Sequence, residues 1–158
     1  MDYEIKSKGE PKVEFLPLEN LTKITCPKNS EGTIHLVVDI EYSFHLVIEE
    51  NAHWTINVEY EKGLIIANNT IEVKEYATLK HNIICYEEIF ELTANQKINL
   101  SSNAEYTSAL LDVSENNKYM AERLQIKEHA PINPQKSIEK RKVNTNTSES
   151  EKSSKGQI

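Results

Sequence analysis

The amino-acid sequence predicts an all-β fold, a short parallel β-solenoid with an N-terminal cap and a disordered C-terminal tail. Three observations lead to this prediction. An alanine-centred pattern recurs along the chain, apolar and polar residues alternate around each alanine, and helical periodicity is almost absent. A strand-containing repeat of about 26 residues is typical of a solenoid, in which each coil stacks on the next and buries a continuous core.

The repeat is centred on four alanines at intervals of 25, 27 and 26 residues: Ala52, Ala77, Ala104 and Ala130. The positions six and four residues before each alanine, and two after it, are apolar or aromatic: Leu46, Ile71, Ile98 and Leu124; Ile48, Val73, Leu100 and Ile126; Trp54, Leu79, Tyr106 and Ile132. Because successive side chains of a strand point to opposite faces, this alternation predicts strands with one buried face. We expect the four segments to stack in register, with a sharp kink at each alanine that leaves room for a methyl group only.

Three segments follow from this pattern. Residues 1–31 are predicted to form a cap or arm, because they are apolar enough to cover an open end but lack the repeat. Residues 32–132 form the solenoid, with IHLVVDI and SFHLVI as the strands of its first coil. Residues 133–158 contain few aliphatic side chains, and burial cannot offset an ordering cost of about 1 to 2 kcal/mol per residue. We therefore expect a disordered polar tail.

Charge and hydropathy exclude several classes of partner. Residues 1–130 carry 22 acidic and 12 basic side chains, a net charge of -10. An acidic body is poorly suited to nucleic acid, which binds to positive surfaces, and the KRK run at 140–142 is too short to change this. No apolar run approaches the roughly 20 residues that span a bilayer, and no secretory signal is visible. We therefore predict a cytoplasmic protein without nucleic-acid or membrane partners.

His81 and Cys85 are the candidate metal-ligating residues. They stand four residues apart in LKHNIIC, so they share one face of the predicted strand. A thiolate is nucleophilic and an imidazole is a common ligand, but a structural zinc site takes four ligands. A buried cysteine also behaves as a small hydrophobe. Filling of the core is favoured over a functional pair, and no other metal or cofactor site is assigned.

No catalytic constellation is apparent in the sequence. The acid pairs Glu49 and Glu50, and Glu87 and Glu88, are adjacent residues, so on strands they point to opposite faces and cannot flank one glycosidic bond. Nucleophile-elbow, phosphate-loop, zinc-protease and dinucleotide motifs are absent. We predict that the protein is not an enzyme.

Two segments resemble the core β-helix of the SufB and SufD proteins of iron–sulfur cluster assembly: HLVIEENAHWTINVEY (45–60) and NNTIEVKEYATLKHNIICYE (68–87). The first matches the family pattern at Glu50, Asn51, Ala52, Glu59 and Tyr60. The second matches it at Asn69, Thr70, Ile71, Val73, Ala77, Leu79 and His81. The resemblance covers residues 32–132, and most matching positions are structural.

The resemblance implies a right-handed parallel β-helix that pairs with a SufB- or SufD-like β-helix and with the SufC ATPase. It implies no stably bound cofactor, with a transient iron–sulfur cluster as the one exception to expect. The family's helical segments, and the cysteine and histidine of the SufB–SufD interface, cannot be mapped here, so the chain corresponds to a shortened form. We expect a scaffold or accessory protein of cluster assembly. The alternative is a stand-alone β-solenoid binding module without cluster chemistry.

Overall fold

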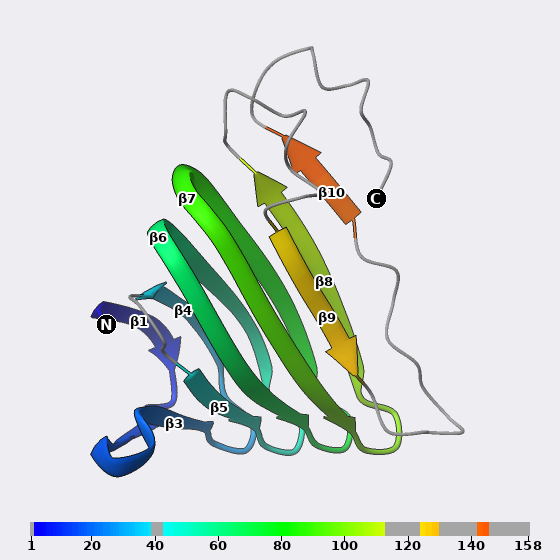
Figure 1. Ribbon diagram of the computed structural model, residues 1–158. Helices are drawn as coiled ribbons and strands as arrows, with labels where there is room; N and C mark the ends of the chain where they lie inside the picture. The colour runs from blue at the N-terminus through cyan, green and yellow to red at the C-terminus, as the bar shows by residue number, and fades with distance from the viewer. Residues whose placement is uncertain (1, 39–42, 113–123, 130–141, 146–158) are drawn as a thin grey trace.

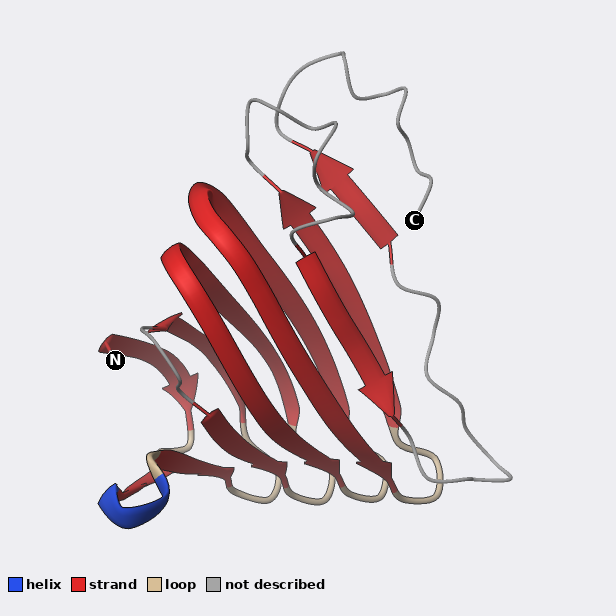
Figure 2. Cartoon of the chain, viewed as in Figure 1, coloured by secondary structure: helices blue, strands red, loops and turns tan. Residues whose placement is uncertain are grey.

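The computed structural model describes residues 2–38, 43–112, 124–129 and 142–145, and nearly all of them lie in strands. These strands wind into a parallel β-solenoid of about three coils (Figure 1). The predicted all-β, parallel solenoid fold is confirmed. Tight turns between coils lie side by side along one edge of the solenoid (Figure 2).

Two parallel sheets form the walls of the solenoid. The first sheet contains β4 (Glu31–Val38), the first part of β6 (His53–Val73), the first part of β7 (Thr78–Leu100) and β8 (Glu105–Asp112). The second sheet contains β3 (Leu21–Cys26), β5 (Ser43–Ile48), the later parts of β6 and β7, and β9 (Leu124–His129). β6 and β7 bend between the sheets, where their pairing shifts register next to Gly63. Each of these two strands therefore contributes to both walls.

Four tight turns lead from the second sheet of one coil to the first sheet of the next. Their sequences are PKNS (27–30), EENA (49–52), KEYA (74–77) and SSNA (101–104). In each turn the N–H of the fourth residue donates to the carbonyl oxygen of the first, at 3.1 to 3.3 Å. The third residue is left-handed, with φ between 59° and 61°, at Asn29, Asn51, Tyr76 and Asn103. Asparagine tolerates this conformation better than most L-residues.

The predicted alanine kinks are the last residues of these turns. Ala52, Ala77 and Ala104 are fully buried, and Ser30 takes the same place in the first turn. The turns stack directly, because the Thr78 N–H donates to the Ala52 carbonyl oxygen at 2.9 Å. Little beyond a methyl group fits where the turns are stacked so closely. Ala130 and Ile132 lie outside the described residues.

The predicted apolar positions of the first three repeats face the core in register. Their side chains are buried, apart from the half-buried Leu100. The columns that they form are Leu46, Ile71 and Ile98; Ile48, Val73 and Leu100; and Trp54, Leu79 and Tyr106.

The predicted register of the fourth repeat is wrong. β9 pairs Leu124 with Leu92, whereas the repeat predicted Ile98 as its neighbour, a shift of six residues. β8 ends at Asp112 and β9 begins at Leu124, and more residues separate these strands than form the bends within β6 and β7. The fourth segment therefore comes later in the sequence than the repeat period requires. Because the shift is an even number, Leu124 and Ile126 still point inward, at 9 % and 8 % exposure. Alternation alone therefore does not reveal the shift.

At the N-terminal end, two antiparallel strands extend the two walls. β1 (Asp2–Lys8) pairs with β4, and β2 (Lys12–Leu16) pairs with β3 and leads into the short 3-10 helix η1 (Pro17–Glu19). Parallel pairing begins with β3, inside the segment 1–31. β1 runs so close to Gly32 that a Cβ there would lie 2.5 Å from the Lys6 carbonyl oxygen. A residue without a side chain is therefore required at this position.

The described chain ends with β10 (Lys142–Thr145), which pairs in parallel with β8. The rest of the tail predicted for residues 133–158 lies outside the described residues.

Tyr76 is the residue that breaks the asparagine column of the turns, and replacing it should stabilise the fold. Tyr76→Asn removes a left-handed tyrosine and offers an amide to Asn51, which already donates to Asn29 in the turn above at 2.8 Å. We expect the free energy of unfolding in urea to rise by about 1 kcal/mol. The reverse exchange, Asn51→Tyr, should lower it by a similar amount. A Tyr76→Asn variant that is less stable than the parent would contradict this account of the turn.

Candidate functional site

The interior of the first sheet becomes more polar along the solenoid axis. One inward column runs from Ile34 through Ile56 to His81 and Ser108. His81 and Ser108 are buried, at 0 % and 4 % exposure. Two branched aliphatic side chains are thus followed by an imidazole and a hydroxyl on the same line of the sheet.

A further column shows the same change, and another is polar at all three of its positions. In the first sheet, Val38 is followed by Tyr60, Cys85 and Asp112. In the second sheet, Asn69 is followed by Gln96 and Glu128. Most buried polar groups are hydrogen-bonded, and unpaired ones are costly. The polar end of the interior is therefore the candidate functional site, because it departs from what a closed apolar core requires.

A chain of three side chains crosses this interior. His81 Nδ1 lies 3.0 Å from the Tyr106 hydroxyl, which donates its hydrogen to Glu128 Oε2 at 2.9 Å. Because the single hydroxyl hydrogen goes to Glu128, His81 must donate from Nδ1 to the Tyr106 oxygen. The rings of Phe44 and His81 also pack in a T-shaped arrangement, with centroids 6.1 Å apart. The imidazole is therefore fixed in position, and Tyr106 connects it to a partly exposed carboxylate on β9.

A second network lies around Asn69. The Phe44 backbone N–H donates to Asn69 Oδ1 at 3.0 Å, and Asn69 Nδ2 donates to Gln96 Oε1 at 2.9 Å. Burial raises the pKa of the Tyr60 hydroxyl, its hydrogen bond to Asn69 lowers it in part, and the nearby Cys85 raises it further. Tyr60 is consequently neutral across the physiological range.

Two buried groups in this region keep unused hydrogen-bonding capacity. Gln96 Nε2 and Ser108 Oγ have no hydrogen-bond partner among the described residues. Gln96 is the register neighbour of Glu128, and Ser108 that of His81, so both groups flank the histidine–tyrosine–glutamate chain. The end of the interior is thus polar and incompletely paired.

The structure places the two predicted candidates, His81 and Cys85, in the core with 0 % exposure. They have separate neighbours: His81 contacts Tyr106, while Cys85 lies in register between Tyr60 and Asp112. Among the described residues, no group of three or more His, Cys, Asp or Glu side chains could hold a metal ion. The pair supplies two donors at most, which is too few for a closed tetrahedral site.

On the outer faces, contacts between histidine and glutamate side chains join neighbouring coils. His35 Nε2 lies 2.6 Å from Glu59 in the first sheet, and His45 Nε2 lies 2.6 Å from Glu72 in the second. Partial burial opposes ionisation of Glu72, but hydrogen bonds and charge from His45 and a neighbouring lysine lower its pKa overall. Such half-exposed pairs contribute little stability each. Their role is structural, because they connect neighbouring coils.

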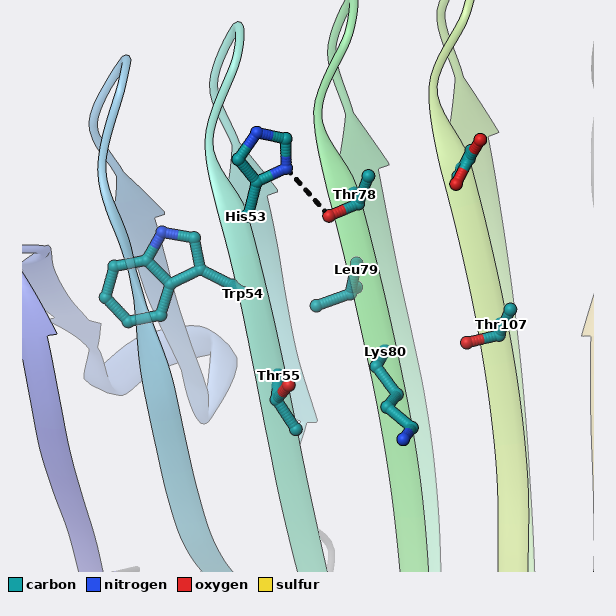
Figure 3. A pocket seen from close by; sticks show the side chains of 8 residues that line it. His53, Trp54, Thr55, Thr78, Leu79, Lys80 and Thr107 are labelled. Atoms are coloured by element: carbon teal, nitrogen blue, oxygen red, sulfur yellow. Dashed lines mark hydrogen bonds between the residues drawn. The ribbon is translucent and has the colours of Figure 1, made fainter.

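A hollow of about 240 Å³ lies on the outer face of the first sheet. Figure 3 shows its polar side chains on three neighbouring strands, where His53 Nδ1 lies 2.9 Å from Thr78 Oγ1. Other polar groups lining it are Thr55, Lys80, Glu105 and Thr107. Sequence reasoning missed this hollow because outward polar residues are what alternation predicts for any solvent-exposed face. The signal that was present is the shared spacing of Thr55, Lys80 and Thr107, which puts them in register.

Comparisons with known proteins do not assign this chain to a family. No family model, no curated protein and no solved structure matches this chain. Within the described part of the chain, no helix has the length and hydropathy needed to cross a membrane.

Tyr106 should contribute to stability through its hydroxyl as well as through its ring. Tyr106→Phe removes the acceptor for His81 and the donor for Glu128, so we expect the free energy of unfolding to fall by about 1 to 3 kcal/mol. Tyr76→Phe is the matched control, because Tyr76 is 61 % exposed, and it should change stability by less than about 0.5 kcal/mol. Equal effects of the two substitutions in urea titrations would refute the buried hydrogen-bond chain.

The Cys26 thiol should be inert in the native protein. Burial raises its pKa from 9.0 to about 12, and its side chain is fully buried. Folding therefore disfavours the thiolate: the stabilisation is complete below pH 9 and is lost as the pH rises towards 12. We expect a thiol reagent to label Cys26 only after unfolding, and Cys26→Ala to flatten part of the alkaline decline in stability. Rapid labelling of Cys26 in the native state would contradict this.

Proposed function

We propose that the protein is a scaffold or accessory component of iron–sulfur cluster assembly of the SufB/SufD type, acting by protein–protein pairing and not as an enzyme. The observation that carries the proposal is the position of the two segments with family resemblance. Residues 45–60 and 68–87 lie on consecutive coils, and His53–Tyr60 pairs residue by residue with Thr78–Cys85. Matching positions of the two segments are therefore neighbours in space, as a β-helix of that family would require.

The polar end of the interior supports a pairing role. Among the described residues, β9 pairs with β7 only, so it is the last described strand of the second sheet. The edge of such a strand can be extended by a strand of another protein. The unused hydrogen-bonding groups of Gln96 and Ser108 lie next to this coil. Both groups are buried, whereas the partly exposed Glu128 beside them is accessible to the polar side chains of a partner.

In this role a cluster is cargo and not a resident cofactor. His81 and Cys85 offer two buried donors, whereas iron–sulfur clusters are commonly held by four protein ligands. Any cluster handled by this chain therefore needs ligands from the partner as well. SufC, the ATPase of the system, is a second expected partner.

Co-purification tests this proposal directly. The tagged full chain should capture a SufB, SufD or SufC protein from the same genome when the two are produced together. Cys85→Ala is the matched control, because pairing through strand edges does not use the buried thiol, and it should capture the same partner. Failure to capture any of the three proteins would overturn the proposed function.

A stand-alone binding module is the second candidate, and the hollow on the outer face favours it. Lys80 and Glu105 place opposite charges beside the hydroxyls of Thr55 and Thr107, which suits a polar protein segment or a glycan. Under this alternative, Lys80→Glu abolishes ligand binding by the chain. Under the scaffold proposal, the same substitution leaves capture of the SufB, SufD or SufC partner intact.

A further inference from the structure

The N-terminal end of the solenoid carries a protruding apolar turn. Phe15, Leu16 and Leu18 are 58 %, 39 % and 101 % exposed. They belong to the end of β2 and to η1, in which no residue is buried, and this turn projects beyond the coils in Figure 1. The turn is held in shape by the Asn20 N–H, which donates to the Pro17 carbonyl oxygen at 3.2 Å. Consecutive apolar side chains on a fixed turn are suited to enter a hollow on another molecule.

A hollow of about 730 Å³ lies on the same end of the molecule. It is lined by Ile5, Ser7, Gly9, Glu10, Pro11 and Val13, so it lies where β1 leads into β2. Ile5 and Val13 are partly buried and pack against the core. One end of the solenoid therefore carries both an apolar projection and a partly apolar recess.

An open strand edge lies between the projection and the recess. β2 pairs with β3 on one side, and no other described strand pairs with it. Unpaired edges of this kind accept a further strand. The side chains along this edge are Lys12, Val13, Glu14, Phe15 and Leu16.

We propose that the surface formed by β2, η1 and the adjacent recess binds a second copy of this chain, through antiparallel pairing of the two β2 strands about a two-fold axis at Val13. In this register Lys12 of one copy faces Glu14 of the other, and the pair occurs twice by symmetry. Phe15 of one copy faces Pro11 of the other, which lines the recess. The apolar projection of each copy is thereby directed at the recess of its counterpart.

Charge selects this register and this partner. An axis at Lys12 would set two lysines against each other, and an axis at Glu14 would set two glutamates against each other; like charges directly opposite are unfavourable. An axis at Val13 instead gives two opposite-charge pairs. A two-fold interface needs one self-complementary surface, and projection, recess and charges all lie on this one end. The proposal does not depend on the role in cluster assembly, since it uses the opposite end of the solenoid from β9.

Sedimentation of the purified full chain over a range of concentrations tests the proposal. We expect a monomer–dimer equilibrium with a Kd of about 1 to 100 μM. Leu18→Glu should raise Kd about tenfold or more, and it cannot destabilise the monomer by loss of packing, because Leu18 is fully exposed. Phe90→Glu is the matched control, since Phe90 is 75 % exposed at the bend within β7, away from β2 and η1, and it should leave Kd unchanged.

A charge exchange tests the register. Lys12→Glu alone and Glu14→Lys alone should each weaken self-association about tenfold, whereas an equimolar mixture of the two variants should dimerise as well as the parent. A chain that is monomeric at all concentrations overturns the proposal. So does a dimer whose Kd responds to Phe90→Glu but not to Leu18→Glu, or a mixture of charge variants that remains monomeric. These measurements use no SufB, SufD or SufC protein, so their outcome is separate from that of co-purification.

Discussion

Parallel stacking in register is the constraint on which the rest of this structure depends. In the coils, each residue lies directly beside its counterpart in the next coil, so equivalent positions form columns. Neighbouring side chains within a column must therefore pack against or bond to each other. Amides satisfy this condition well, because the NH₂ group of one can donate to the carbonyl oxygen of the next. Asn82 donates to Asn57 at 2.8 Å, and Asn95 donates to Asn68 at 3.1 Å. Outward columns of this kind add side-chain hydrogen bonds to those of the backbone.

The inward columns must satisfy a stricter form of the same condition. Aliphatic side chains stack without further requirements, whereas a buried polar group must find a partner across the interior. The protein meets this requirement in part by reaching from one wall to the other: Tyr106 in the first sheet donates to Glu128 in the second, and Tyr60 in the first sheet bonds to Asn69 in the second. Within the second sheet, Asn69 also bonds to Phe44 and Gln96. Cross-wall bonds fix the spacing between the sheets as well as the register within them. The polar coils are therefore held together by different interactions from the apolar coils that precede them.

Much of the fold follows from sequence because strand alternation and stacking period are both local patterns. The turns at Ala52, Ala77 and Ala104 were predictable, since a small residue at a constant interval is visible without knowledge of neighbours. Ser30 was missed because a different small residue occupies the same column. The shift of β9 was missed because an even displacement leaves inward and outward positions unchanged.

The candidate site was predictable only in part. His81 and Cys85 stand an even number of residues after Ala77, so strand alternation predicts that they are buried. It does not predict which side chains they contact. Tyr106 and Glu128 join His81 through the register of β8 and the unexpected register of β9, and neither is encoded in the spacing around His81. Glu128 in particular lies two residues before Ala130, where the repeat predicts a kink. Contacts that cross the interior depend on the width of the coil and the length of its connections, which a single repeat period does not contain.

The two ends of the solenoid differ in chemistry, and this difference limits how the molecule can assemble. A solenoid with identical open ends would add copies head to tail without limit, since heterologous contacts that do not close form filaments. Here the N-terminal end is extended by antiparallel strands and carries the exposed Phe15 and Leu18, whereas the other end carries the partly exposed Glu128 above a polar interior that contains Gln96 and Ser108. Placing one end on the other would bury polar groups against apolar ones, at a cost for each group left unpaired. Head-to-tail growth is therefore disfavoured by the change from apolar to polar residues along the columns, and the two ends are suited to different partners.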